Sequence, residues 1–187
     1  MRHCRRSIIS KPGYATLAIH FGEYEKGAEI ALEVGDSFYR AVQGGAVFGF
    51  EPFPRALCLY AHARTTRQKK FLKAARDVRQ NLNSWVRKGG INLLHQLLIL
   101  DAEEAAYRGN VELAKSNYLK AITTVSRGGF LQDAGLANAR YASYLLAIDP
   151  NNNASDATYH YNESIRNYSE WGSNRRVAML QEKIAQQ

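Results

Sequence analysis

The feature that most constrains this chain is an apolar pattern with the period of an α-helix, which restarts at nearly regular intervals. Along most of the 187 residues apolar side chains recur every three or four positions, and the alternation typical of a β-strand is almost absent. The pattern restarts at Gly22, Thr66, Gly109 and Asn152, so the intervals are 44, 43 and 43 residues. This regularity predicts an all-α chain of stacked helical hairpins.

The clearest hairpin spans residues 91–127, with a Gly109-Asn110 turn at its centre. Glycine ends a helix by taking a left-handed conformation at no steric cost, and asparagine caps the next helix by accepting from its first N–H groups. The residues after the turn, Ala114, Tyr118 and Ala121, are spaced as in a tetratricopeptide (TPR) repeat. In such a repeat, small side chains lie where two helices cross closely and the aromatic ring fills the space towards the next hairpin.

The same template fits the other three repeats, most closely the last one. Its positions there are Ala157, Tyr161 and Ser164, and the looser matches are Gly27, Ala31, Val34 and Phe71, Ala75, Val78. The period near 43 residues exceeds the roughly 34 of a standard TPR, so we predict a TPR-like α-solenoid of about four hairpins with longer helices or loops. We expect the solenoid to occupy residues 13–187, after a poorly ordered leader at 1–12. A loop is expected to be inserted at about 43–55, where three Gly and two Pro accompany three Phe.

Several classes of protein are excluded by the composition. No apolar run approaches the roughly 18 to 20 residues of a membrane span, so we expect no transmembrane segment. The N-terminus makes a poor signal peptide, which favours a cytoplasmic, intracellular location. The two cysteines, Cys4 and Cys58, are too few for a disulfide framework, and we expect free thiols with Cys58 buried. The five histidines are scattered, so no metal site is predicted.

Two further stretches resemble a known family. They are Gly128–Asn138 and Tyr168–Asn174, the latter followed by Val177 and Leu180. They are similar to the C-terminal helical region of large signalling ATPases and multi-kinase proteins, in which a kinase-like domain and an AAA-type ATPase domain precede a TPR-like solenoid. Ser173 stands where that family usually has alanine. With weaker matches upstream, the resemblance covers about residues 14–185, and it implies a role in signal transduction.

The residues that would carry out ATP chemistry in such proteins are absent from this sequence. It has no Gly-x-x-x-x-Gly-Lys-Ser/Thr loop, no His-Arg-Asp and no Asp-Phe-Gly motif, and the Gly44–Gly49 run lacks the spacing of a phosphate cradle. We therefore expect no enzyme activity, no catalytic residues and no cofactor. The acidic residues Asp101, Glu103 and Glu104 are interpreted as a solvated helix face. Two alternatives stay open, a stand-alone remnant of the solenoid and a piece of a longer ATPase or kinase.

Positive charge is concentrated in one predicted helix. Residues 64–88 hold nine Lys or Arg and one acid. On a helical wheel, one side of this helix is apolar and carries Phe71, Ala75, Val78, Leu82 and Trp85. The opposite side carries the cations Lys69, Lys73, Arg76 and Arg87. Burial of the apolar side would expose the four cations, either as an ordinary solvated surface or as a docking face for an anionic partner.

From the sequence we therefore expect a non-catalytic protein-binding scaffold. In a solenoid, the first helices of successive hairpins line a concave surface that binds an extended or helical peptide, so a protein or peptide partner is the first hypothesis. The alternative is binding of nucleic acid or another anionic surface through the basic helix 64–88, with Lys69, Lys73, Arg76 and Arg87 as the partner-binding residues.

Overall fold

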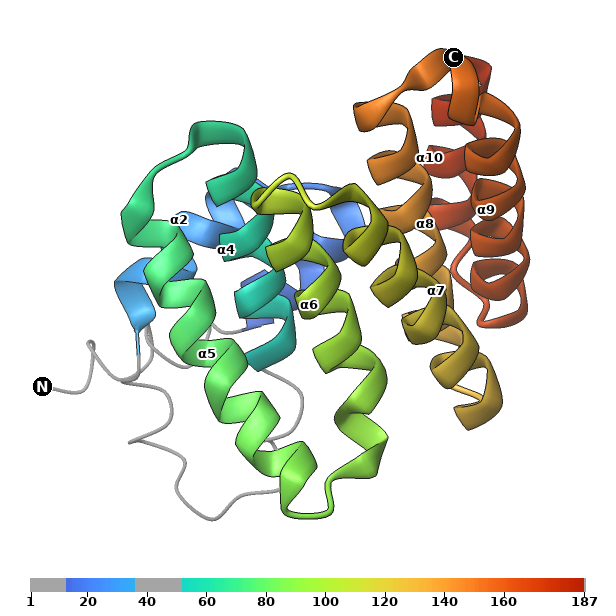
Figure 1. Cartoon of the computed structure of the whole chain (residues 1–187). Helices are drawn as coiled ribbons and strands as arrows, with labels where there is room; N and C mark the ends of the chain where they lie inside the picture. Colours follow the sequence, from blue (N-terminus) through green and yellow to red (C-terminus); the bar gives the residue numbers. More distant parts are fainter. Residues whose placement is uncertain (1–12, 36–51, 187) are drawn as a thin grey trace, which may run out of the picture. The chain divides into compact units, whose positions relative to one another are not determined.

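A computed structural model describes residues 13–35 and 52–186, in which the regular secondary structure is helical and contains no strand. The prediction of an all-α chain is confirmed for this part (Figure 1). Helical residues 13–21 come first, followed by α2 (Tyr24–Val34), α4 (Pro52–Thr66), α5 (Lys69–Arg87), the 3₁₀ turn η2 (Ile91–Leu93), α6 (Leu94–Tyr107), α7 (Val111–Gly128), α8 (Leu131–Ile148), α9 (Pro150–Glu170) and α10 (Asn174–Ala185).

Two of the expected irregular segments fall largely beyond the described residues. The leader at 1–12 lies outside them, and so does 43–51 of the expected loop. The last residues of that loop belong to a helix, because α4 begins at Pro52. Proline suits the first position of a helix, since its fixed φ matches the helix and its missing N–H has no partner to lose there.

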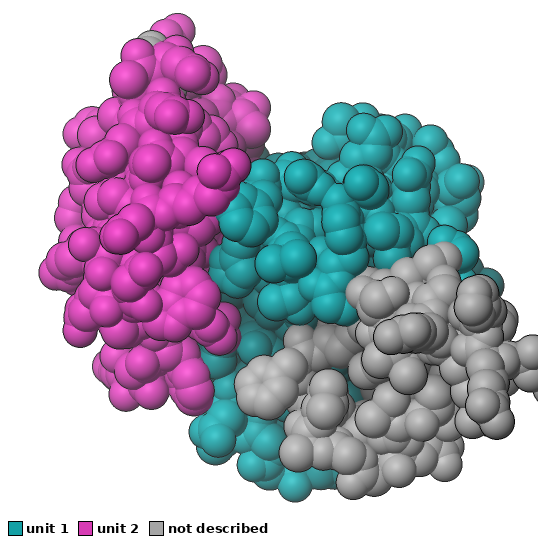
Figure 2. Space-filling view, turned by 180° about the vertical axis from the view of Figure 1, so that it is seen from behind, with its two compact units in different colours: residues 1–114 teal, residues 115–187 magenta. Residues whose placement is uncertain are grey.

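The chain divides into two compact units, residues 1–114 and 115–187, which Figure 2 shows in different colours. Unit 1 contains α2 to α6, and unit 2 contains most of α7 with α8, α9 and α10. No helix in the described ranges is both long and apolar enough to cross a bilayer.

Helix α4 is the centre of unit 1. It packs against α2, α5 and α6, and eleven of its fifteen residues are buried. Cys58 lies on the side towards α2 and is buried as expected, next to Gly27. A β-carbon added at Gly27 would lie 2.6 Å from the Cys58 sulfur and 2.9 Å from the Ala18 Cβ. The absence of a side chain at Gly27 therefore lets α2 approach α4 and the first helix closely.

The core of unit 2 is formed by tyrosines packed between helices. Tyr118 of α7 is fully buried, with its ring centroid 5.4 Å from that of Tyr141 and 5.6 Å from that of Tyr144, both on α8. Polar contacts join α8 to α9: the Ser164 hydroxyl donates to the Gly135 carbonyl (2.6 Å), and a ring nitrogen of His160 lies 2.8 Å from the Asn138 side-chain oxygen.

The end of unit 2 is closed by a helix. Trp171 does not close this end, because it lies in the turn after α9 and is 46% exposed. Instead α10 packs against α9 and buries Leu180 and most of Arg176, whose guanidinium lies 5.1 Å from the Tyr168 ring centroid. An amphipathic helix covers more apolar surface than one indole, which is why α10 provides the closure.

The predicted turns agree with the helix ends. Gly22 and Gly109 both have positive φ, and the Asn110 side chain accepts from the Leu113 N–H (3.1 Å), so Asn110 caps α7 as expected. The fourth turn lies slightly before Asn152, because Asp149 is the N-cap of α9 and accepts from the Asn152 N–H (3.1 Å). A carboxylate at the N-cap followed by proline is a stronger start signal than the asparagine inside the first turn.

Candidate interaction surface

Helix α5 carries the four cations that the sequence singles out. Its apolar side is buried through Phe71, Ala75, Val78 and Leu82, whereas Trp85 is only half-buried. Lys69, Lys73, Arg76 and Arg87 are all exposed, as the helical wheel predicts. They do not form one cluster. Lys69 and Lys73 are one helical turn apart, but Arg87 follows Lys73 by 14 residues, which is about 21 Å along the helix.

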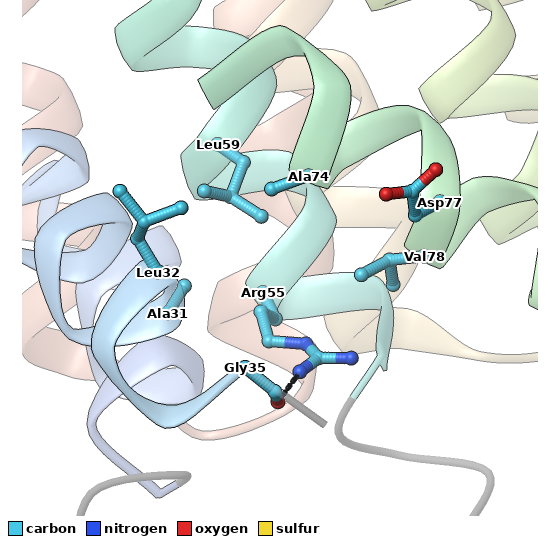
Figure 3. A pocket seen from close by; sticks show the side chains of 8 residues that line it. All are labelled: Ala31, Leu32, Gly35, Arg55, Leu59, Ala74, Asp77 and Val78. Carbon is cyan, nitrogen blue, oxygen red and sulfur yellow. Dashed lines mark hydrogen bonds between the residues drawn. The ribbon is translucent and has the colours of Figure 1, made fainter. Parts of the chain in front are cut away.

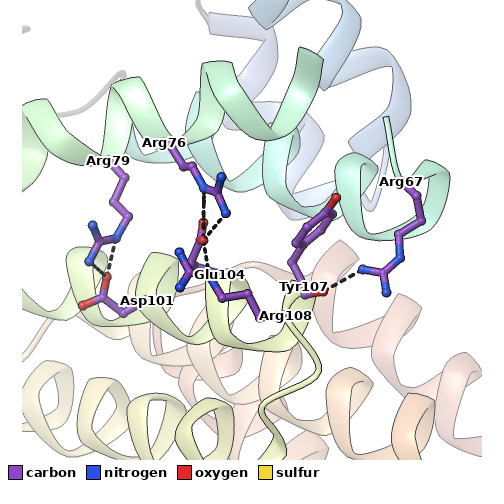
Figure 4. A network of polar contacts seen from close by, with 7 residues as sticks. All are labelled: Arg67, Arg76, Arg79, Asp101, Glu104, Tyr107 and Arg108. Carbon is purple, nitrogen blue, oxygen red and sulfur yellow. Dashed lines mark hydrogen bonds and ion pairs between the residues drawn. The ribbon is translucent and has the colours of Figure 1, made fainter. Parts of the chain in front are cut away.

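The middle of α5 is engaged by acidic residues of α6 (Figure 4). Two nitrogens of Arg76, Nε and Nη2, donate to Glu104 Oε1 at 3.0 and 2.6 Å. Arg108, at the end of α6, donates to the same oxygen at 2.7 Å. One turn further along α5, Arg79 forms an ion pair with Asp101. Glu104 therefore bridges two arginines, and the two pairs fix α5 against α6.

The interpretation of Asp101, Glu103 and Glu104 as a solvated helix face is wrong. Glu103 is 1% exposed, and its Oε2 lies 3.6 Å from Arg64 Nη1 on α4. The Glu104 side chain is 13% exposed. The reason is that α6 packs against both α4 and α5, so its carboxylates meet the arginines of those helices. The sequence does contain a signal for this pairing: residues 64–88 are basic, and the helix that follows them carries three acidic residues.

These polar contacts and the burial between α4, α5 and α6 shift the pKa values of the groups involved, which we call the Glu104 network. Burial by itself raises the pKa of Glu104, but the hydrogen bonds from Arg76 and Arg108 outweigh it, so the pKa of this carboxyl lies below its ordinary value. Burial raises the pKa of Asp101, with Arg79 opposing the change. Burial and the neighbouring Glu104 raise the pKa of the Tyr60 hydroxyl. Glu104 is thus the stable anion at the centre of the network.

Ion pairing reduces the charge that α5 offers to a partner. Of the nine cations in 64–88, Arg64, Arg76 and Arg79 pair with acids of α6, and Arg67 donates to the Tyr107 carbonyl (2.6 Å). Within the two described ranges, no ion pair involves Lys69, Lys73 or Arg87. The exposed cations of α5 therefore lie towards its two ends, with a largely neutralised stretch between them.

A small pocket lies between α2, α4 and α5 (Figure 3). Its volume is about 140 Å³, well below the roughly 300 Å³ at which pockets for drug-sized ligands begin. The Arg55 guanidinium lies in it and donates to the Gly35 carbonyl. It is lined by Ala31, Leu32, Gly35, Arg55, Leu59, Ala74, Asp77 and Val78.

The groove expected on the first helices of the hairpins is not open along α4. This helix is the first of its hairpin, and its buried residues run without a break from Pro52 to Ala61. Its partner α5, the second helix of the pair, does present exposed charged side chains, among them Lys69 and Lys73. The sequence did not reveal that α4 is covered, because the prediction assumed that one side of each first helix is exposed.

Comparisons of this chain with protein-family models, with curated proteins and with solved structures gave no match.

Changing Glu104 to glutamine should lower the free energy of unfolding by about 1 to 2 kcal/mol at pH 7, because charge-assisted hydrogen bonds are lost while the exposed arginines remain hydrated. The folded pKa of Glu104 lies below the ordinary value of 4.5, so its stabilisation is present above that pH and is lost as the pH falls through the folded pKa. Urea unfolding of both proteins from pH 7 downwards should show the difference in unfolding free energy becoming smaller below pH 4.5, as Glu104 takes up a proton. A difference that stays constant with pH would mean that the Glu104 charge does not stabilise unit 1.

Proposed function

We propose that this chain is a non-catalytic protein-interaction module, a TPR-like solenoid that serves as a scaffold. The packing of unit 1 supports this. Helix α4 contacts α2 of the preceding hairpin and α6 of the following one, while α5 lies against both α4 and α6. This is the order of contacts expected when helical hairpins stack in sequence.

The burial of the template positions is a second support for the repeat. The residues at the template positions are buried in all four predicted repeats. They are Gly27, Ala31, Val34, Phe71, Ala75, Val78, Ala114, Tyr118, Ala121, Ala157, Tyr161 and Ser164. Because the same offsets recur with a period near 43 residues, we infer that each hairpin uses the same packing scheme.

A role in cytoplasmic signal transduction rests on the resemblance of two stretches to the C-terminal region of signalling ATPases. The two aromatic residues of the second stretch, Tyr168 and Trp171, contact each other with ring centroids 6.2 Å apart. Tyr168 is buried against Gly135 of the first stretch, where a β-carbon would lie 2.9 Å from its ring. The two stretches therefore form one packed element of unit 2, and we propose that they share a structural role there.

The proposed binding residues are Lys69 and Lys73, with Arg87 further along α5. The observation that carries this assignment is that these cations are exposed and unpaired within the described residues, on a helix that Glu104 and Asp101 hold in place. A fixed cation loses less conformational freedom on binding than one on a mobile segment. The partner that suits them is a protein segment with separated acidic side chains.

The alternative function, binding of nucleic acid or another anionic surface through residues 64–88, uses the same exposed lysines. Nucleic acid presents a continuous row of phosphates. On α5 such a row would cross the stretch where Arg76 and Arg79 are already neutralised by Glu104 and Asp101. Discrete acidic groups avoid this mismatch, which is why a protein segment is proposed first.

The test is to select peptides from a random peptide library on the purified protein at 50 and 200 mM salt. Wild type should enrich peptides with spaced Asp or Glu, and Lys69→Glu combined with Lys73→Glu should weaken their binding at least tenfold. The matched control is Lys120→Glu with Arg127→Glu, which makes the same charge change at two exposed cations of α7 and should leave binding intact. Arg76 is left unchanged because its reversal would break the pair with Glu104.

The alternative function is tested by measuring the binding of a fluorescent single-stranded RNA of random sequence to the same proteins. Tight RNA binding that falls steeply with salt and is abolished by the same two reversals would favour the alternative function. Enriched peptides that bind both double variants equally would show that Lys69 and Lys73 are not the binding residues.

A further inference from the structure

The connection between α5 and α6 forms a tight, well-defined tip at one end of unit 1 (Figure 1). The Gly89 N–H donates to the Val86 carbonyl (3.1 Å), and the Gly90 N–H donates to the Trp85 carbonyl (3.0 Å). Gly89 has a φ of +103°, and a β-carbon at Gly90 would lie 3.0 Å from the Trp85 carbonyl oxygen. The positive φ therefore favours glycine at position 89, and the close Trp85 carbonyl favours it at position 90.

The tip presents apolar side chains to solvent. Ile91, the first residue of η2, is 65% exposed, the largest value among the large apolar side chains of the described ranges. Val86, Leu93 and Leu94 beside it are half-buried. Neither the turn nor the core of unit 1 requires a branched aliphatic side chain at this exposed position.

The same tip is cationic. Arg87 and Lys88 are exposed, and in the part of the chain that the structure describes neither takes part in an ion pair. The sequence has no acidic residue between Asp77 and Asp101. Asp77 is nine residues before Val86 on α5, which is about 14 Å along the helix at about 1.5 Å per residue. Asp101 forms an ion pair with Arg79. The apolar residues are therefore bordered by positive charge alone along this stretch of chain.

We propose that this tip docks on an anionic phospholipid surface, with Ile91 entering the interfacial region and with Arg87 and Lys88 at the level of the lipid headgroups. The charge of the tip is complementary to that of an anionic leaflet, and long cationic side chains keep their charged ends among headgroups while their stems lie along apolar surface. A turn between two helices is convex, and a convex surface suits contact with a planar lipid surface. With a single apolar side chain and two cations the contact is weak and reversible.

The test uses the full chain and vesicles of phosphatidylcholine containing 30% phosphatidylserine, with vesicles of phosphatidylcholine alone for comparison. Co-sedimentation should require phosphatidylserine and should decrease with salt. Ile91→Asp should weaken binding at least tenfold, and each of Arg87→Gln and Lys88→Gln should weaken it about fivefold. Leu119→Asp is the matched control, because it places the same charge at a 46% exposed leucine of α7 and should bind like wild type.

Thermal unfolding of each variant checks that the fold is intact, and the two glutamine variants test the proposal even if Ile91→Asp unfolds. The proposal is overturned if wild type does not bind the phosphatidylserine vesicles, or if Ile91→Asp, Arg87→Gln and Lys88→Gln all bind them as wild type does. It is also overturned if Lys69→Glu with Lys73→Glu abolishes vesicle binding while the tip variants retain it, since the lipid surface would then be the other end of α5. A change in sedimentation velocity on Ile91→Asp without vesicle binding would identify the tip as a contact between copies of this chain.

These outcomes are independent of the proposed protein-binding function. Arg87 is proposed for both functions, but Lys69 and Lys73 are proposed for peptide binding alone, and Ile91 and Lys88 for vesicle binding alone. The variants at these four positions therefore show which function fails while the other stands.

Discussion

Replacing Tyr118 by alanine should lower the free energy of unfolding of unit 2 by about 3 to 5 kcal/mol. The Tyr118 ring is fully buried and lies against Tyr141 and Tyr144 of the neighbouring helix. Its removal loses the transfer free energy of a large side chain and leaves a cavity that two rigid rings cannot fill by small movements. Urea unfolding followed by near-ultraviolet circular dichroism measures the loss, because the signal comes largely from packed aromatic rings.

The next residue on α7 provides the control. Leu119 is 46% exposed, and Leu119→Ala should change the free energy of unfolding by no more than about 0.5 kcal/mol. Equal effects at positions 118 and 119 would mean that the register of α7 against α8 is wrong, and with it the template on which the repeat is based.

Replacing Gly27 by alanine should lower the free energy of unfolding of unit 1 by about 1 to 3 kcal/mol. Alanine is normally the better helix former, by about 1 kcal/mol, so a loss would be opposite in sign to the propensity effect. It is expected because the new methyl group would lie 2.6 Å from the Cys58 sulfur and 2.9 Å from the Ala18 Cβ, distances that force the helices apart.

A double variant separates this steric effect from others. Cys58→Ala removes the sulfur atom, so Gly27→Ala should cost less in the Cys58→Ala background than in wild type. The rescue should be partial, since the contact with Ala18 remains. Thermal unfolding of the four proteins gives the coupling free energy. A coupling of zero would show that α2 and α4 do not cross closely at Gly27.

Much of the fold was predictable from local chemistry. The Gly109-Asn110 pair supplies a left-handed residue and a cap, and both are used as predicted. Tyr118 and Tyr161, which mark the same position in two of the predicted repeats, are both fully buried. These features depend on residues close together in the sequence, and the helical period alone identifies the side of a helix that must be covered.

The candidate surface was less predictable, because it depends on which helices become neighbours. The wheel correctly predicts that Arg76 is exposed, but a wheel for α5 contains no information about Glu104 on α6. In the same way, the period of α4 does not reveal that it is covered by α2, α5 and α6 together. Tertiary contacts decide which cations are paired with acidic residues and which are not. A count of lysines and arginines therefore overstates the positive charge that is available to a partner.

The position of the boundary between the two units has a practical consequence for dissecting this protein. It falls between Ala114 and Lys115, inside α7, so the polypeptide passes from one unit to the other through a continuous helix. Cutting the chain at that point would remove the first turn of α7 together with the Asn110 cap. A recombinant fragment intended to carry unit 2 should therefore start at Asn110, and the gene should be divided at the Gly109 codon.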